Sequence, residues 1–423
     1  MTDEARRVQR TYLLLTLLTT LAASFIWGVN TLFLLDAGLS NTEAFAANAF
    51  FTVGQVLFEV PTGVVADTRG RRYSFMLGAG TLLLSTLLYL LMWNVGAPFW
   101  GWAIASILLG LGFTFFSGAT EAWLVDALAA TGFSGDLESV FGRAQVVGGV
   151  AMLAGSVLGG VIAQFTDLGV PYIVRAAMLG ITLIVAWRFM HDIGFTPQRG
   201  ATTLGAVRTV LSGAIDGGLR NRPVRWLMLA APFTVGVAFY AFYAFQPYLL
   251  QLYGDPNAYS IAGLAAAILA GAQIVGGLLV PVARRLFTRR THVVIASAFL
   301  SIVFLIWIGL TTSFLLAIVL VAVWSVVLAL EEPMRRAFMN GLISSEQRAT
   351  VLSFDSLMGS AGGVVIQPAL GRTADLYGYG ASYLVAGGIQ ALALPFALLA
   401  RRENASSDPI TAEIAEPSAP GGA

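Results

Sequence analysis

Long apolar stretches recur along the whole chain and are separated by short polar or Gly/Pro-containing breaks. A helix needs about 20 apolar residues to cross the roughly 30 Å hydrocarbon core of a bilayer. The run from Tyr73 to Thr120 is too long for one crossing, and Asn94, Gly96 and Pro98 provide a turn inside it. We therefore expect twelve membrane helices, near residues 11–35, 43–66, 73–94, 98–126, 141–164, 171–190, 224–252, 258–283, 292–311, 313–334, 347–370 and 380–400.

The composition supports an all-α membrane protein. Hydrophobic residues make up 57% of the chain and charged residues only 11%, and the mean hydropathy is +0.78, whereas soluble domains carry roughly 25% charged residues. A net charge of +1 gives no indication of a nucleic-acid partner. The chain has no cysteine, which excludes disulfides, thiolate metal sites and a thiol nucleophile. We expect no cofactor and no metal.

The arginines are distributed unevenly between the loops. With the N-terminus inside, 22 of the 24 arginines lie at cytoplasmic helix ends or loops, and only Arg175 and Arg372 lie toward the outside. Because cytoplasmic loops retain positive charge, this predicts a multi-pass protein of the inner (cytoplasmic) membrane with both termini in the cytoplasm. The first apolar segment is too long for a cleaved signal peptide, so we expect it to remain as the first helix.

The longest loop, from His191 to Pro223, divides the chain into two groups of six helices. We expect an N-terminal bundle over residues 1–190, a cytoplasmic linker over 191–223 and a C-terminal bundle over 224–402. Residues 403–423 are rich in Pro, Ser, Ala and acidic residues and are expected to form a disordered cytoplasmic tail.

The two groups of helices also echo one another in sequence. The Arg-rich turn after the second helix has a counterpart in Arg284–Arg290 after the eighth, and Glu121 in helix four has one in Glu331 of helix ten. Phe141-Gly142-Arg143-Ala144, which opens helix five, is echoed by Gln347-Arg348-Ala349 at helix eleven. Such ordered echoes are typical of transporters built from two pseudo-repeats.

The segment after helix two carries a family resemblance. Gly63-Val-Val-Ala-Asp67-Thr-Arg69-Gly70-Arg71-Arg72 resembles the signature loop of the major facilitator superfamily, and the preceding Glu59-Val60-Pro61-Thr62 resembles a large bacterial branch of it. The resemblance covers nearly the whole chain and implies a twelve-helix transporter with alternating access. Thr68 departs from the pattern, since the family usually has arginine there.

The charges of this loop are themselves informative. Gly63 allows a close helix approach and Gly70 a tight turn, while Asp67, Arg71 and Arg72 lie at the bilayer edge and need partners. Asp126, near the cytoplasmic end of helix four, is at the right depth to pair with Arg71, and Glu121 lies deeper. The resemblance implies a gating latch between helices two, four and eleven. The alternative is that these charges only set the topology.

Two motifs that mark proton-coupled drug antiporters in this family are incomplete. Ser106 stands where a basic residue is expected in helix four, and Ser156 stands where helix five should have proline. Helix five keeps Gly155, Gly159 and Gly160, which permit close packing. The antiporter interpretation is weakened but not excluded.

Three ionisable residues inside predicted crossings stand out, because a charge costs roughly 2.5–3.5 kcal/mol at the helix centre. Glu59 in helix two and Asp355 in helix eleven are candidates for proton coupling; the alternative is that they are buried partners that stabilise packing. Arg175 in helix six is either a snorkelling cation or a partner of a substrate or carboxylate.

Helix seven is unusually aromatic, and helices one, four and ten, which line the cavity with it in a transporter of this type, offer further aromatic residues. The candidate cavity residues are Trp27, Asn30, Phe33, Phe113, Phe116, Arg175, Tyr240, Tyr243, Gln246 and Trp324. Such a lining favours an apolar, aromatic or amphiphilic small molecule. The alternative is that each ring only packs against other helices or lies at the membrane interface.

These features predict a monomeric secondary transporter that exports a small hydrophobic or amphiphilic substrate in exchange for protons. A proton-coupled importer of a sugar or other nutrient is the main alternative, and a sensor or a lipid flippase is also left open. An enzyme is not expected, because the two histidines, His191 and His292, lie at predicted helix ends and no HExxH or GxSxG motif is present. The absence of a P-loop points to an ion gradient as the energy source.

Overall fold

The computed structural model describes residues 2–133, 135–197, 205, 207–208, 212 and 214–410. The central linker, residues 191–223, is therefore described only in part. Residues 411–423 of the predicted tail lie outside the described residues. The first half contains α1 Asp3–Trp27, α2 Asn30–Asp36, α3 Asn41–Arg69, α4 Arg71–Val95, α5 Phe99–Thr114, α6 Ala119–Ala130, α7 Leu137–Phe165 and α8 Val170–Phe189. The second half contains η1 Ala214–Leu219, α10 Arg222–Tyr253, α11 Tyr259–Leu286, α12 Arg290–Leu310, α13 Phe314–Asn340, α14 Ser345–Ala391 and α15 Ala393–Arg402.

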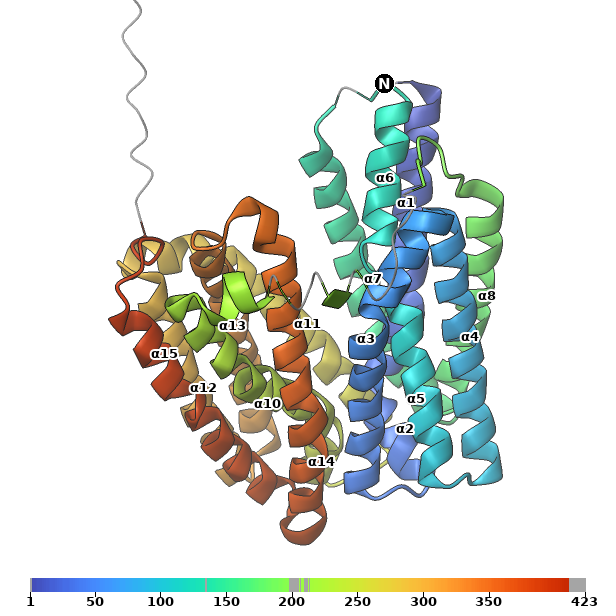
Figure 1. Cartoon of the computed structure of the whole chain (residues 1–423). Coiled ribbons are helices and arrows are strands. Elements are labelled where there is room, and N and C mark those ends of the chain that lie inside the picture. The colour runs from blue at the N-terminus through green and yellow to red at the C-terminus, as the bar shows by residue number, and fades with distance from the viewer. Residues whose placement is uncertain are drawn as a thin grey trace, which may run out of the picture.

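The helices form two bundles that stand side by side, one from α1–α8 and one from α10–α15 (Figure 1). The N-terminus and the end of α15 lie at one face, which we call the terminal face. The other face, where α3 begins and α14 turns back, is called the opposite face. The arginine distribution predicts that the terminal face is cytoplasmic.

Eleven helical spans of the described chain are long and apolar enough to cross a membrane, and the last of them contains two crossings. That span, Thr350–Arg402, has 53 residues. It reverses at Gly378, whose φ of 81° and ψ of 168° are not helical. A positive φ is readily adopted only by glycine, so this residue lets the chain turn back after helix eleven. The twelve predicted crossings are thereby accounted for.

Two predicted helices are interrupted. The first crossing is divided into α1 and α2 at Gly28 and Val29, and the fourth into α5 and α6 around Ser117 and Gly118. Gly118 has a φ of 66°, which a continuing helix cannot contain. The predicted ranges 11–35 and 98–126 are therefore correct as crossings but wrong as continuous helices.

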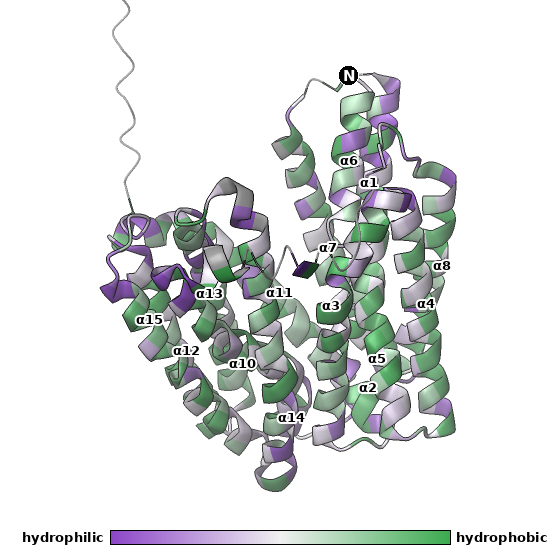
Figure 2. Cartoon of the chain, in the orientation of Figure 1, coloured by the Kyte–Doolittle hydropathy of each residue, from purple (hydrophilic) through white to green (hydrophobic). Residues whose placement is uncertain are grey.

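The surface has the polarity expected of a protein surrounded by lipid. Large apolar side chains such as Trp100, Phe165, Leu278 and Leu315 are exposed along the helices. Hydrophilic residues gather toward the terminal face of both bundles, and hydrophobic residues cover the helices below it (Figure 2). Polar residues thus lie where water and lipid headgroups can solvate them, and apolar residues lie where lipid tails would surround the helices.

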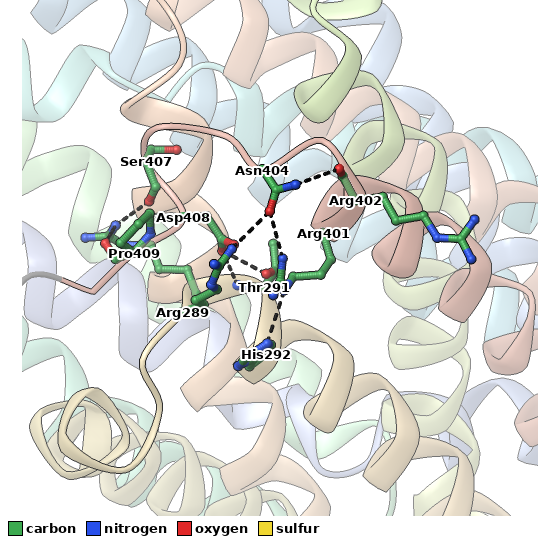
Figure 3. Close-up of polar contacts among 10 residues, drawn as sticks. Arg289, Thr291, His292, Arg401, Arg402, Asn404, Ser407, Asp408 and Pro409 are labelled. Atoms are coloured by element: carbon green, nitrogen blue, oxygen red, sulfur yellow. Dashed lines mark hydrogen bonds and ion pairs between the residues drawn. The ribbon is translucent and has the colours of Figure 1, made fainter.

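The first part of the predicted tail is ordered. Asp408 is fully buried and its Oδ1 accepts hydrogen bonds from the backbone N–H of Thr291 at 2.9 Å and from the Thr291 hydroxyl at 2.7 Å. Arg289 lies 3.5 Å from the other carboxylate oxygen (Figure 3). The backbone N–H of Ile410 also donates to the Thr288 carbonyl. Residues 403–410 thus form a strap across the start of α12, and the prediction of disorder from residue 403 is wrong for this segment.

Candidate functional site

The break in the first crossing is bridged by a side chain from the other half. The Gln246 carboxamide in α10 donates to the Trp27 carbonyl at 2.7 Å, and its oxygen accepts from the Thr31 backbone N–H at 3.0 Å. Trp27 and Thr31 lie on either side of the break, where the helical hydrogen bonds are interrupted. Gln246 therefore satisfies two backbone groups that a bilayer interior could not solvate.

A second contact between the halves lies at the start of α3. Asp375 in α14 accepts from the backbone N–H groups of Asn41 and Thr42, each at 2.9 Å, and from the Thr42 hydroxyl at 2.5 Å. The hydroxyl of Tyr379 donates to the Asn41 side chain. A carboxylate at a helix N-terminus is favoured both by hydrogen bonding and by the helix dipole. These bonds hold the halves together at the opposite face.

Glycines bring three helices into direct backbone contact near the same face. A Cβ added at Gly263 in α11 would lie 2.6 Å from the Ser156 carbonyl oxygen and 2.8 Å from the Cα of Gly160, both in α7. A Cβ on Gly28 would lie 2.7 Å from the Cα of Gly263. Small residues permit such approach in membrane helices. The helix-five glycines thus pack closely, and the molecule is closed at the opposite face.

A buried cluster of rings and polar groups lies beside the broken helix. The ring of Phe33 stacks on Tyr172 with centroids 4.0 Å apart. The Tyr172 hydroxyl donates to the Asn30 side chain at 2.9 Å, and the Asn30 amide donates to Asn48 at 2.9 Å. Tyr243, from the second half, lies close enough to Tyr172 to interact with it electrostatically. The structure thus brings together four of the predicted cavity residues: Asn30, Phe33, Tyr243 and, at the break, Gln246.

Arg175 belongs to the same cluster. Its side chain is only 2% exposed, and its Nε donates to the Thr86 hydroxyl at 3.0 Å. The hydroxyls of Tyr172 and Tyr89 are the groups that interact with it electrostatically among the described residues. A snorkelling arginine would place its guanidinium at the membrane surface. The burial of Arg175 favours the other interpretation, that of a partner for an anionic group.

Other predicted cavity residues are placed differently. Phe116 packs against Phe75 with centroids 4.7 Å apart, inside the first bundle. Tyr240 is fully buried and donates to Ser382, and Trp324 lies in the same core cluster of the second bundle. Phe113 is partly buried against Phe51. In this conformation Phe116, Tyr240 and Trp324 contribute to core packing, and their place in a substrate cavity stays a prediction.

A buried ion pair ties three helices of the second half. Arg335 in α13 contacts both carboxylate oxygens of Asp355 in α14, at 2.5 and 2.7 Å, and also donates to the Leu227 carbonyl in α10. Two parallel bonds of this kind are the strong form of an arginine–carboxylate contact. Asp355 therefore has a fixed cationic partner that the sequence did not indicate.

Glu331 is the residue that the site prediction missed. It is 8% exposed, and within the described part of the chain it makes no hydrogen bond or ion pair. It lies one turn before Arg335 on α13, so both side chains occupy one face of that helix. The signal was available in the sequence, because Glu331 is an acidic residue in helix ten and the counterpart of Glu121. Glu121 itself is exposed.

Glu59, the other predicted coupling residue, is exposed rather than buried by protein. Its carboxylate accepts a hydrogen bond from the Ser117 hydroxyl at 2.7 Å, at the break between α5 and α6. The side chain therefore lies at the contact between helices two and four.

The signature loop has the predicted turn and part of the predicted latch. Gly70 has a φ of 111° and separates α3 from α4. Arg71 forms an ion pair with Asp67 at 2.5 Å and lies 3.9 Å from Asp126. Both partners belong to the first half, and neither comes from α14. A Cβ at Gly63 would meet nothing within 4 Å, so the predicted close approach at this glycine is absent in this conformation.

The loop is also capped by a residue that follows the last helix of its own half. The Asp192 carboxylate accepts from the backbone N–H of Arg72 at 2.8 Å, and the Arg72 guanidinium donates to the Trp187 carbonyl. Asp408 caps α12 at Thr291 in the same way, after the last helix of the second half. The two halves therefore share a carboxylate cap at corresponding helices, which supports the pseudo-repeat.

Two helical bundles that meet at a broken crossing, with buried charges between apolar helices, are an arrangement typical of membrane transporters. The chain belongs to the Major Facilitator Superfamily, whose family model matches residues 12–363. It is 22% identical over 198 residues to an uncharacterised MFS-type transporter of Methanocaldococcus jannaschii. That match spans 47% of this chain and about half, 49%, of the relative.

Solved structures of transporters share the fold. The nucleoside transporter NupG superposes with a TM-score of 0.75 at 11% identity, covering 94% of this chain and 99% of that one. A D-xylose-proton symporter gives 0.63 at 16% identity, covering 93% and 96%. A bacterial homologue of the human lysosomal transporter Spinster gives 0.69 at 15% identity, covering 95% and 98%. At these identities the likeness shows the fold alone.

Proposed function

We propose that this transporter exports a hydrophobic or amphiphilic small molecule in exchange for protons. The observation that carries the proposal is the arrangement of Glu331, Arg335 and Asp355: a buried carboxyl group without a partner beside a buried ion pair. Ionisable groups inside a membrane are costly and are typical of proton and substrate pathways. No nucleotide site is indicated by the sequence, so an ion gradient supplies the energy.

The three residues provide a physical route for coupling. When Glu331 is ionised, it competes with Asp355 for the guanidinium of Arg335. When Glu331 binds a proton, Arg335 is held by Asp355 alone, and α13 stays fixed to α14. Proton binding thereby changes the contacts between helices that must move in alternating access. Glu59 and Asp355 stay as further candidates for the proton, and Glu59 lies where α3 meets the break in the fourth crossing.

The energy released when one proton crosses the membrane is sufficient to drive export. A charge moving through about 150 mV supplies roughly 3.5 kcal/mol. This maintains a gradient of a few hundredfold for a neutral compound. The aromatic groups beside the broken helix, Phe33 and Tyr172, suit an apolar or aromatic body. The latch residues Asp67, Arg71 and Asp126 would close the terminal face in the alternate state, which places the signature loop in gating.

We further propose the membrane, the oligomeric state and the orientation of the protein. The protein lies in the cytoplasmic membrane as a monomer, with the terminal face and both termini in the cytoplasm. Because the chain has no cysteine, single cysteines test this directly. Cysteines at Gly96 and Tyr377 should react with an impermeant thiol reagent in intact cells, and those at Arg69 and Thr288 should be shielded. Reversal at two of these positions would contradict the orientation.

Growth of a host stripped of its own efflux pumps tests the export function. Expression should raise resistance to some apolar or amphiphilic compounds of a toxic panel, and Glu331→Gln should abolish that gain. Glu332→Gln is the matched control, because Glu332 is the exposed neighbour that pairs with Arg336 on the surface. Equal resistance with both variants would remove Glu331 from the mechanism.

A proton-coupled importer of a polar nutrient is the second candidate. The buried amides of Asn30, Asn48 and Gln246 favour it, since a polar substrate needs such groups. However, Asn30 and Gln246 use their donors and acceptors on other protein groups. Growth on single nutrients in the same host separates the two functions: a nutrient dependence without any resistance would favour import.

A further inference from the structure

The buried guanidinium of Arg175 lacks a carboxylate. Its Nε donates to Thr86, but within the described chain its two terminal nitrogens make no hydrogen bond. Neither of these nitrogens is completely enclosed by protein atoms. Both therefore keep a small accessible surface although the residue is 2% exposed. Arg335, whose side chain is 11% exposed, has the opposite arrangement, with both carboxylate oxygens of Asp355 as partners.

The missing carboxylate at Arg175 has an energetic consequence. An arginine keeps its charge in proteins, and an isolated buried ion carries a large desolvation cost unless an opposite charge and hydrogen bonds compensate it. The hydroxyls of Thr86, Tyr89 and Tyr172 supply dipoles but no negative charge. The planar fork of a guanidinium matches the geometry of a carboxylate or phosphate. A positive site is thus available for a group that the chain itself does not provide.

The surroundings define what else the bound molecule contacts. Tyr172 lies one turn before Arg175 on α8 and stacks on the rings of Phe33 at 4.0 Å and Tyr89 at 5.9 Å. Tyr243 approaches from the second half. Aromatic rings around one cation favour a ligand with an apolar or aromatic body and an acidic group.

A further unpaired donor lies in the same cluster. The amide nitrogen of Asn48, in a residue 3% exposed, is enclosed and has no hydrogen-bond partner, while its oxygen accepts from Asn30. Buried donors of this kind normally have partners. Arg175 and Asn48 thus leave unmatched donors on both sides of the Tyr172–Asn30 pair.

We propose that Arg175 binds the anionic group, a carboxylate or an equivalent acid, of an aromatic or apolar substrate. The inference names the substrate class of the transporter and rests on the proposed function. Since the cluster touches the helix-one break at which the halves meet, alternating access would open and close the path to it.

Matched probes of one shape and three charges test this. Purified protein in lipid nanodiscs is titrated with 2-naphthoate, its neutral amide and 2-naphthylmethylamine, and binding is followed by thermal stabilisation and by calorimetry. We expect the wild type to prefer the anion. Arg175→Gln should weaken 2-naphthoate binding about ten- to hundredfold, as expected for loss of charged hydrogen bonds, while amide binding changes little. Arg175→Lys should recover part of the affinity.

Arg372→Gln is the control, because Arg372 is the other arginine expected toward the outside and it is exposed. It should bind all three probes as the wild type does. Equal binding of the three probes by the wild type, or no binding of the anion, would overturn the proposal. If Arg175→Gln does not fold, the anion preference of the wild type and the partial recovery in Arg175→Lys still decide. Absence of export with intact anion binding would refute only the proposed function.

Discussion

Replacing Gly263 by alanine should force the opposite face open. The added Cβ would lie 2.6 Å from the Ser156 carbonyl oxygen and 2.8 Å from the Cα of Gly160, and both of these are backbone atoms that cannot rotate away. Ordinary contacts between carbon atoms lie at about 3.5–4.0 Å, so α11 and α7 must separate by roughly 1 Å. Overpacking of this kind costs about 1–3 kcal/mol.

This cost is present only in the state that is closed at the opposite face. The equilibrium between the two facing states should therefore shift about 5- to 150-fold toward the state open at that face. The substitution itself favours helix formation, so the folded protein should persist. Transport should fall, because the protein returns less often to the state shown here.

Distances between spin labels measure the shift. One pair, at Asn94 and Tyr377, spans the opposite face, and a second pair, at Ala130 and Leu286, spans the terminal face. In Gly263→Ala the first distance should lengthen and the second should shorten. Gly277→Ala makes the same change on the same helix where a Cβ meets nothing within 4 Å, and it should leave both distances unchanged. Identical distance distributions in the two variants would refute the packing argument.

Three further predictions follow from single contacts. Gln246→Leu removes both hydrogen bonds across the helix-one break, so hydrogen exchange of the Thr31 amide should rise and labels at the opposite face should separate; unchanged exchange would contradict the bridging role. Asp355→Asn removes the carboxylate that holds Arg335 through two hydrogen bonds and should lower stability by about 3–5 kcal/mol. Replacing Arg335 and Asp355 together by apolar residues should restore the thermal midpoint but not transport. Asp67→Asn should reduce transport strongly in a folded, inserted protein, and a normal rate would exclude the latch.

The membrane helices could be predicted because their signal is local. An apolar stretch of sufficient length must form a helix in a bilayer, whatever its neighbours are. The interruption at Gly28 and Val29 could not be predicted, because its partner, Gln246, lies 215 residues from Thr31 in sequence. A hydrogen bond between a backbone group and a side chain far away in sequence cannot be read from a hydropathy pattern.

The site was predicted less completely than the fold, for a related reason. Helices in a membrane bundle are apolar on all sides, so composition does not reveal which face of a helix Phe116 or Tyr240 occupies. The sequence did identify Asp355, but Arg335 was counted among the charges of a cytoplasmic helix end. Only the tertiary contacts show that these two residues pair and leave Glu331 without a partner.

Transport in proteoliposomes shows directly whether the protein exchanges its substrate for protons. Vesicles with an imposed pH gradient are loaded with a compound that the growth screen identifies, and the movement of protons and of the compound is followed together. We expect the compound and the protons to move in opposite directions, with this exchange lost in Glu331→Gln and retained in Glu332→Gln. Accumulation of the compound in the same direction as the protons would establish import, and exchange that persists unchanged in Glu331→Gln would contradict the coupling mechanism.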